Sequence, residues 1–154
     1  MRLEVRQASA EDMELSFAIG EGAMREYVKA TWGVWEQDEQ RRAHAELFSP
    51  TTHWIVLAND REVGVVAAAN ETSHVQLVKL YLCSEVRSQG IGSKVLRSIL
   101  RYGASHVKPV RLRVLSVNQR AQAFYARHGF RESSRTAERV FMVAKPNPVE
   151  RQGT

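Results

Sequence analysis

The sequence predicts an α/β (α+β) fold in which a single mixed sheet is flanked by helices. Two observations lead to this prediction. Amphipathic helical segments alternate with strand-like apolar runs along the chain. The middle of the chain also combines a hairpin with strand–helix–strand crossovers, which requires antiparallel and parallel pairs in one sheet. The length of 154 residues suits one core, so we expect one domain over residues 1–145 and a flexible tail over residues 146–154.

The first elements are a short strand and two helices. Residues 2–7 (RLEVRQ) alternate apolar and polar side chains, as a strand does. Ser9 is followed three residues later by an acid, which is close to a capping box, and apolar residues at helical spacing continue to Tyr27. The segment Trp32–Trp35 breaks this helix, and residues 36–48 form a second, very polar one.

A hairpin and a third strand make up the middle of the chain. The apolar runs His53–Ala58 and Val63–Ala69 are separated by Asn59-Asp60-Arg61-Glu62. Asn and Asp tolerate turn conformations, so this spacing predicts a hairpin. His74–Leu82, which is rich in Val, Leu and Tyr, is predicted as the next strand.

The remaining elements alternate between helix and strand. Residues 92–104 carry apolar side chains on one helical face, and residues 110–117 alternate Val or Leu with Arg. A helix over residues 118–128 follows, and the last strand or strands end with residues 139–144.

Composition and charge exclude several classes of protein. Apolar residues make up 44% and charged residues 25%, and the longest apolar run, Val63–Ala69, is too short to span a membrane. Met1–Glu4 offers no apolar start for a secretory signal, and Cys83 is the single cysteine, so we expect a soluble cytoplasmic protein. The net charge of +5 is scattered along the chain, which argues against a nucleic-acid groove and is compatible with a small polyanionic ligand.

The most informative segment joins the strand ending at Leu82 to the helix starting near Gly92. Its glycines, Gly90 and Gly92, let consecutive backbone N–H groups converge on an anion, and the helix behind them adds partial positive charge. Neither the dinucleotide fingerprint, which needs a glycine at Val95, nor the Walker A spacing matches. A glycine turn without a ligand is the alternative interpretation.

A second constellation follows the strand at residues 110–117. Asn118 lies at the strand end, and Tyr125 lies two helical turns further on, on the same helix face. Taken alone, Asn118 is equally an ordinary helix N-cap and Tyr125 an ordinary core aromatic. The wider pattern is Val117-Asn118-x-x-Ala121-x-x-Phe124-Tyr125-x-x-x-Gly129-Phe130.

Together the two motifs carry a resemblance to a known family. Arg-x-x-Gly-x-Gly at residues 87–92 resembles the acetyl-CoA loop of the GNAT-type N-acetyltransferase superfamily. The pattern from Val117 to Phe130 is similar to the second signature of the same superfamily, in the correct order along the chain. The resemblance covers residues 2 to about 144, although the first fifty residues match only in general pattern.

The resemblance implies a mostly antiparallel, twisted sheet with splayed central parallel strands, here those ending at Leu82 and beginning at Val110. It implies acetyl-CoA as cosubstrate and a primary amine as acceptor. The backbone N–H near Leu82 would stabilise the oxyanion, and Tyr125 would donate to the departing sulfur. The residues implied to hold acetyl-CoA are Leu80, Leu82, Arg87, Ser88, Gln89, Gly90, Ile91, Gly92, Ser93, Asn118 and Tyr125.

The general base and the acceptor pocket are less defined. Some family members carry a glutamate five residues before the asparagine, but that position is Arg113, which cannot accept a proton. Glu26 and Glu36 are candidates because they flank the segment expected to roof the acceptor pocket, although most such acids only solvate a surface. The aromatic residues predicted to bind the acceptor, with core packing as the alternative, are Tyr27, Trp32 and Trp35.

Other partners are expected to be few. The histidines and Cys83 show no metal-ligand spacing, so no metal is expected, and Cys83 is interpreted as packing rather than as a nucleophile. We expect no nucleic acid and no membrane as partners, and a homodimer only by analogy with the family. A regulatory module that binds acyl-CoA without transferring the acyl group is the alternative function.

Overall fold

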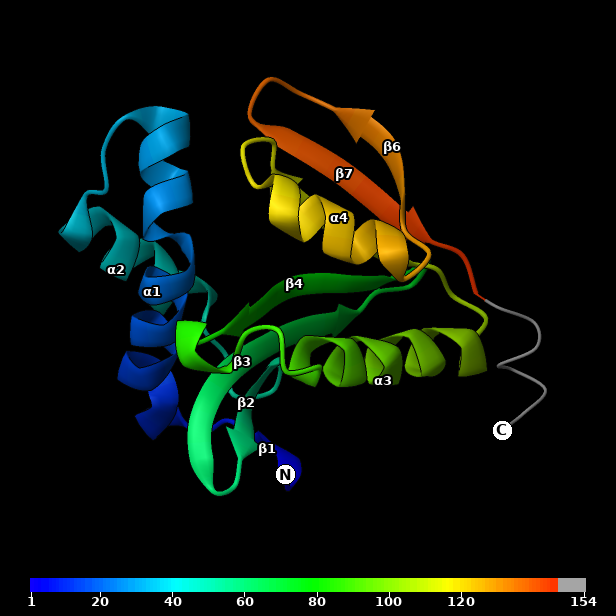
Figure 1. Ribbon diagram of the computed structural model, residues 1–154, viewed down its shortest axis with the longest axis horizontal. Coiled ribbons are helices and arrows are strands. Elements are labelled where there is room, and N and C mark those ends of the chain that lie inside the picture. The colour runs from blue at the N-terminus through cyan, green and yellow to red at the C-terminus, as the bar shows by residue number, and fades with distance from the viewer. Residues whose placement is uncertain (147–154) are drawn as a thin grey trace. The chain divides into compact units, whose positions relative to one another are not determined.

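The structure of the protein is a computed structural model, which describes residues 1–146. Along the chain its elements are one strand, two helices, three strands, and then helix, strand, helix and two final strands (Figure 1). Their bounds are β1 Leu3–Gln7, α1 Met13–Trp32, α2 Gln37–Leu47, β2 His53–Ala58, β3 Arg61–Asn70, β4 Val75–Leu82, α3 Ile91–Ser105, β5 Val110–Leu115, α4 Gln119–Arg127, β6 Arg131–Arg135 and β7 Arg139–Ala144. Short 3₁₀ turns lie at Ala10–Asp12 and Ser84–Val86.

The strands form one sheet in the order β1-β2-β3-β4-β5-β7-β6. β1 with β2, β2 with β3, β5 with β7 and β6 with β7 are antiparallel, whereas β4 and β5 are parallel. The parallel pairing joins Val75 with Val110 and Gln76 with Arg111, and within the described residues it ends there. The predicted fold, a mixed and mostly antiparallel sheet flanked by helices with a central parallel pair, is confirmed.

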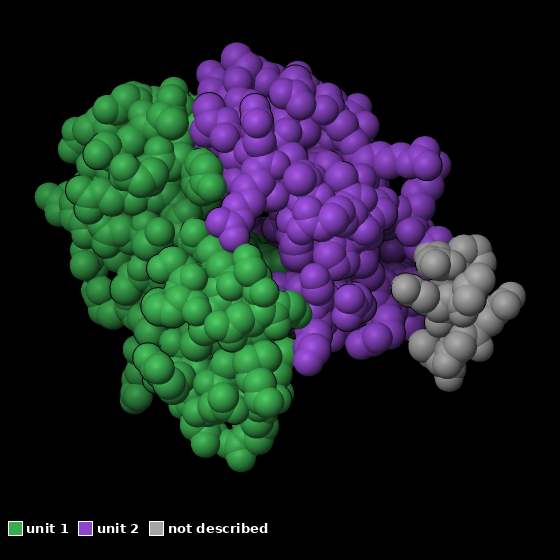
Figure 2. Space-filling view, viewed as in Figure 1, with its two compact units in different colours: residues 1–68, 79–91 green, residues 69–78, 92–154 purple. Residues whose placement is uncertain are grey.

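The chain divides into two compact units (Figure 2). Unit 1 comprises residues 1–68 and 79–91, and unit 2 comprises residues 69–78 and the chain from residue 92 onward. The first half of β4 therefore belongs to unit 2 and its second half to unit 1, and α3 begins with the last residue of unit 1.

In unit 1, α1 packs against the strands through apolar side chains. Ile19 of α1 joins a buried cluster with Ala8, Ile55 and Val65, and Tyr81 packs against the same cluster. Every residue of β3 from Val63 to Ala67 is buried, which explains why this strand is an unbroken apolar run in the sequence.

The start of α1 is fixed by a charged contact at the end of β1. The Arg6 guanidinium donates to both carboxylate oxygens of Asp12, at 2.8 and 3.0 Å. Asp12 also accepts a hydrogen bond from the backbone N–H of Ser9 at 2.8 Å, which is half of the predicted capping box. α1 ends at Gly33, whose φ of +86° is the left-handed conformation typical of a helix stop.

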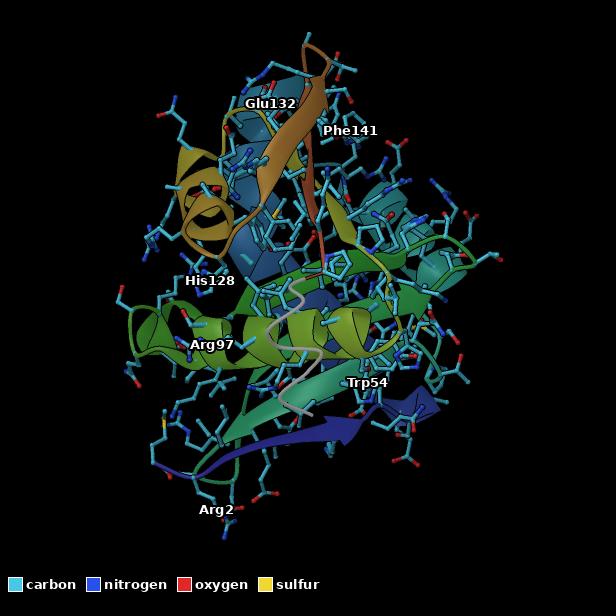
Figure 3. The ribbon with its side chains drawn as sticks, turned by 90° about the vertical axis from the view of Figure 1, so that its right-hand side faces the viewer. Arg2, Trp54, Arg97, His128, Glu132 and Phe141 are labelled. Carbon is cyan, nitrogen blue, oxygen red and sulfur yellow. The ribbon has the colours of Figure 1, made fainter. Side chains whose placement is uncertain are left out.

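In unit 2, β5 turns one apolar face inward and leaves its arginines outside. Val110, Leu112 and Val114 are buried, whereas the intervening Arg111 and Arg113 are exposed. β7 pairs with β5 on one side and with β6 on the other. Glu132 of β6 and Phe141 of β7 are labelled in Figure 3.

Two details differ from the expectations. The hairpin turn consists of Asn59 and Asp60 alone, with φ of +51° and +67°, because Arg61 and Glu62 pair with Ala58 and Leu57 inside the strands. β6 has the sequence RESSR and is exposed at every position, so it has no apolar pattern from which a strand could be predicted. Of the predicted tail, residues 147–154 lie outside the described part of the chain.

Among the described residues, no helix has both the length and the apolar character needed to cross a membrane. The same residues bring together no group of three or more His, Cys, Asp or Glu side chains that could ligate a metal ion.

Candidate active site

The end of β4 is held close to β3 by a glycine. A Cβ atom at Gly64 would lie 2.6 Å from Leu82 Cδ2 and 2.7 Å from the backbone oxygen of Tyr81. No other residue fits this approach without movement of the strand. The Cys83 N–H donates to the Val63 oxygen at 2.8 Å, which continues the contact beyond Leu82. The residues predicted to bind the pantetheine arm, Leu80 and Leu82, thus lie on a firmly placed strand end.

The loop after β4 contains two residues in the left-handed conformation. Ser88 has a φ of +67° and Gly90 a φ of +82°. A Cβ atom at Gly90 would meet nothing within 4 Å, so glycine is favoured there by its backbone conformation and the space beside it is open. The side chain of Gln89 donates to the Glu85 oxygen at 3.2 Å and folds back along the loop.

The loop leads directly into the first turn of α3. Ile91 is fully buried and fixes the start of the helix in unit 1. The N–H groups of Ile91, Gly92 and Ser93 belong to the first helical turn, where an α-helix provides no acceptor of its own. With the partial positive charge of the helix N-terminus, they form an arrangement suited to a phosphate group.

In unit 2, Asn118 and Tyr125 lie at the start and near the end of α4. Asn118 is buried, and its Oδ1 accepts a hydrogen bond from the Ala121 N–H at 3.1 Å, so it is the N-cap of the helix. The ring of Tyr125 lies between those of Phe124 and Phe130, at centroid distances of 5.2 and 5.5 Å. Asn118 therefore has the structural role of an N-cap, and Tyr125 is partly buried against two neighbouring aromatic rings.

The candidate acids of unit 1 are exposed. Glu26 projects from α1 with 81% of its side chain accessible and pairs with Lys29 at 3.8 Å. Glu36 is exposed at the N-cap of α2. Both carboxylates therefore face solvent rather than a buried pocket.

The three predicted acceptor-binding aromatics differ in environment. Trp32, at the end of α1, is 49% exposed. Tyr27, earlier in the same helix, is partly buried. Trp35 is partly buried: its Nε1 donates to Gln37 Oε1 at 2.7 Å, and its ring lies 6.4 Å from that of Phe17. Trp35 thus begins a row of rings that continues through Phe17 to His44, at 5.6 Å.

Lys79 lies in unit 1 between two histidines, a cluster that the sequence analysis missed. Its Nζ lies 3.2 Å from Nδ1 of His44 on α2 and 3.3 Å from Nε2 of His53 on β2. The three residues are far apart in the sequence, so no local motif reveals them. The available signal was a lysine within the otherwise apolar end of the His74–Leu82 run.

Burial shifts the protonation equilibria of this cluster. It lowers the pKa of Lys79 to about 8. Burial, followed by the nearby Lys79 charge, lowers the pKa of His53 to about 4, and the same two causes lower that of His44. At pH 7 the cluster therefore holds one ammonium group between two neutral imidazoles.

Comparisons with known proteins agree with this architecture. The family model described as the acetyltransferase (GNAT) family matches residues 21–130. No curated protein matches the chain.

Solved structures share the fold at low sequence identity. The PaiA N-acetyltransferase of Thermoplasma acidophilum, in complex with coenzyme A, is 21% identical with a TM-score of 0.72, over 94% of this chain and 99% of that one. An acetyltransferase of Thermus thermophilus is 16% identical, with a TM-score of 0.74 over 94% and 97% of the two chains. The ribosomal-protein-S18-alanine N-acetyltransferase of Escherichia coli is 14% identical, with a TM-score of 0.71 over 94% of both. The family match spans most of the chain and includes both motifs from which the resemblance was inferred, and the chain therefore belongs to the GNAT family of acetyltransferases.

Proposed function

We propose that this protein is an acetyl-CoA-dependent N-acetyltransferase that transfers the acetyl group to a primary amine by direct attack. The acceptor amine belongs to a small molecule, an amino acid or a protein. The observation that carries the proposal is the segment after β4, in which Ser88 and Gly90 adopt positive φ and lead into a helix start anchored by Ile91.

The residues present fit coenzyme A. In the proposal, the backbone of Leu80 and Leu82 pairs with the pantetheine arm as an added strand. The N–H groups of residues 88–93 bind the pyrophosphate, and Arg87 adds charge at the entrance of the loop. The open space beside Gly90 supports this fit, because a side chain there would occupy the place of the ligand.

The chain's own groups act on the charge that develops during transfer. Acetyl-CoA, when bound, supplies an activated acetyl thioester, with the CoA thiol as the leaving group. As the amine nitrogen bonds to the carbonyl carbon and the carbon–sulfur bond breaks, the N–H near Leu82 stabilises the negative carbonyl oxygen. Tyr125 donates to the sulfur; since free thiols and phenols have pKa values of about 8.5 and 10, the donation acts mainly as a hydrogen bond.

Two further roles are compatible with the structure. Oδ1 of Asn118 is engaged in capping α4, so in the proposal its Nδ2 is the atom that bonds to the pantetheine or thioester region. The proton lost by the amine leaves through a water relay or is accepted by Glu26 or Glu36, both of which are exposed. The cytoplasmic location and the homodimer stay predictions from the sequence.

Two measurements test the proposal. Titration calorimetry with coenzyme A should detect binding to the folded protein, and acetyl-CoA with a panel of primary amines should release CoA thiol. Binding without release from any amine would favour the regulatory, acyl-CoA-binding alternative. The lack of any heat of binding, with folding verified by circular dichroism, would contradict the proposal.

A further inference from the structure

The Lys79 cluster holds a positive charge that no carboxylate of residues 1–146 pairs with. Among the described residues, Lys79 forms no ion pair, and its two contacts are to imidazole nitrogens. Glu14 of α1, whose charge acts on His44, is already paired: Arg41 of α2 donates to it at 2.7 Å. A partly buried ammonium without a counter-ion is costly, and a bound anion removes that cost.

The two histidines are fixed as hydrogen-bond acceptors toward Lys79. Nε2 of His44 lies 3.1 Å from the Met13 oxygen, and Nδ1 of His53 lies 3.0 Å from the Ser49 oxygen. The Lys79 ammonium can only donate, so the ring nitrogens that face it must accept, and the outer ring nitrogens carry the protons. Nδ1 of His53 also lies 3.1 Å from the Thr52 hydroxyl oxygen and 3.5 Å from the Ser49 nitrogen. The inner nitrogens then present lone pairs to Lys79, which donates two of its three protons and keeps one for another acceptor.

The cluster lies where the proposed function needs an acceptor site. Lys79 directly precedes Leu80 on β4, the strand end expected to pair with the pantetheine arm. His44 comes from α2, and the ring row from Trp35 through Phe17 reaches it. Unit 1 thus joins the cluster to the segment expected to roof the acceptor pocket.

We propose that the Lys79 ammonium, held between His44 and His53, binds a carboxylate of the acceptor, so that the enzyme acetylates amines of the amino-acid type. This inference rests on the proposed function. A second amino group in the same position, as in a polyamine, would be repelled by Lys79.

Matched acceptors provide the first test. Glycine and glycinamide, L-phenylalanine and phenethylamine, and L-lysine and cadaverine are compared by CoA-thiol release at saturating acetyl-CoA. We expect the KM of each carboxylate-bearing member to be lower by about 10- to 100-fold, the range for one hydrogen bond to a charged group. Equal KM values within the pairs would overturn the inference and leave the transferase function standing.

Variants assign the preference to Lys79. In Lys79→Met, the KM of the amino acids should rise by about 10- to 100-fold, while the KM for acetyl-CoA, glycinamide and phenethylamine stays unchanged. Lys145→Met, which removes an exposed lysine after β7, is the control for the loss of one positive charge. A preference that survives in Lys79→Met would overturn the inference.

The pH dependence of the wild type gives a test that needs no variant. The KM for amino acids, expressed as the concentration of their neutral-amine form, should rise as the pH passes about 8, where Lys79 loses its proton. The facing His44 and His53 are neutral there and cannot replace the charge. The neighbouring Arg41–Glu14 pair keeps its charges over this range. A KM that stays level across pH 8 would overturn the inference, as would binding of coenzyme A without acetylation of any amino acid. Absence of coenzyme A binding would instead overturn the proposed function itself.

Discussion

Replacing Gly64 by alanine should destabilise the protein and displace the end of β4. The added Cβ atom would lie 2.6 Å from Leu82 Cδ2 and 2.7 Å from the Tyr81 oxygen, and 3.3 Å from Val56 Cβ. The leucine methyl group can rotate away, but the Tyr81 oxygen belongs to the backbone, so the strand itself must move.

The magnitude follows from this overlap. Overpacking of a close contact costs typically 1–3 kcal/mol, and the backbone contact places Gly64→Ala at about 2–3 kcal/mol. At roughly 2–4 °C per kcal/mol for a chain of this size, the melting temperature should fall by about 4–12 °C. Because Leu80 and Leu82 lie on the displaced strand end, the affinity for coenzyme A should fall as well.

A second glycine provides the matched control. Gly22 lies in α1, and a Cβ atom there would meet nothing within 4 Å. Gly22→Ala should therefore raise the stability by about 0.5–1 kcal/mol, since alanine loses less backbone entropy in a helix. Thermal unfolding by circular dichroism and calorimetry with coenzyme A measure both variants. Gly64→Ala melting at or above the wild-type temperature would refute the reasoning.

Three further predictions concern the loop, the transfer step and the acid stability. Gly90→Ala should weaken coenzyme A binding by roughly 10-fold, because a left-handed φ of +82° costs a residue with a Cβ atom about 1–2 kcal/mol. Gly90→Asn should lose less affinity, because asparagine tolerates this conformation better. Equal affinities of the two variants in calorimetry would argue against a conformational cause. Tyr125→Phe should lower kcat by about 10²-fold in the CoA-thiol assay, and an unchanged kcat with chemistry rate-limiting would remove Tyr125 from the role of proton donor. The Arg6 guanidinium lowers the pKa of Asp12 from 3.8 to about 2, so the pair should contribute about 1–2 kcal/mol that is present above pH 4 and lost as the pH falls through 2. Denaturant titrations of wild type and Asp12→Asn at pH 5 and pH 2 measure this, and parallel losses would contradict it.

Local patterns in the sequence predicted most of the fold and part of the site. The glycines of the loop and the spacing from Asn118 to Tyr125 are short-range signals, because one loop and one helix carry each of them. The signal that ends α1, a glycine at position 33, is equally short-range. β6 could not be predicted in this way, since its exposed RESSR sequence has no buried face to leave a period in the sequence.

Non-local contacts account for what the sequence did not reveal. Lys79 meets His44 and His53 only because β4, α2 and β2 come together in unit 1, and no spacing encodes that encounter. The overlap that makes Gly64 necessary likewise depends on Tyr81 and Leu82 of the neighbouring strand. Such tertiary contacts determine that Lys79 becomes partly buried and that no larger residue fits at Gly64.

The path of β4 through both units has a consequence for synthesis on the ribosome. By the time residue 91 has emerged, every segment of unit 1 is present, whereas unit 2 has contributed only residues 69–78. Val75 and Leu77 are almost fully buried in the folded protein. In the nascent chain they stay exposed to solvent until β5 has been synthesised and Val110 pairs with Val75. This interval leaves an apolar strand edge unprotected in the nascent chain, and it is the stage at which a chaperone would have most to shield.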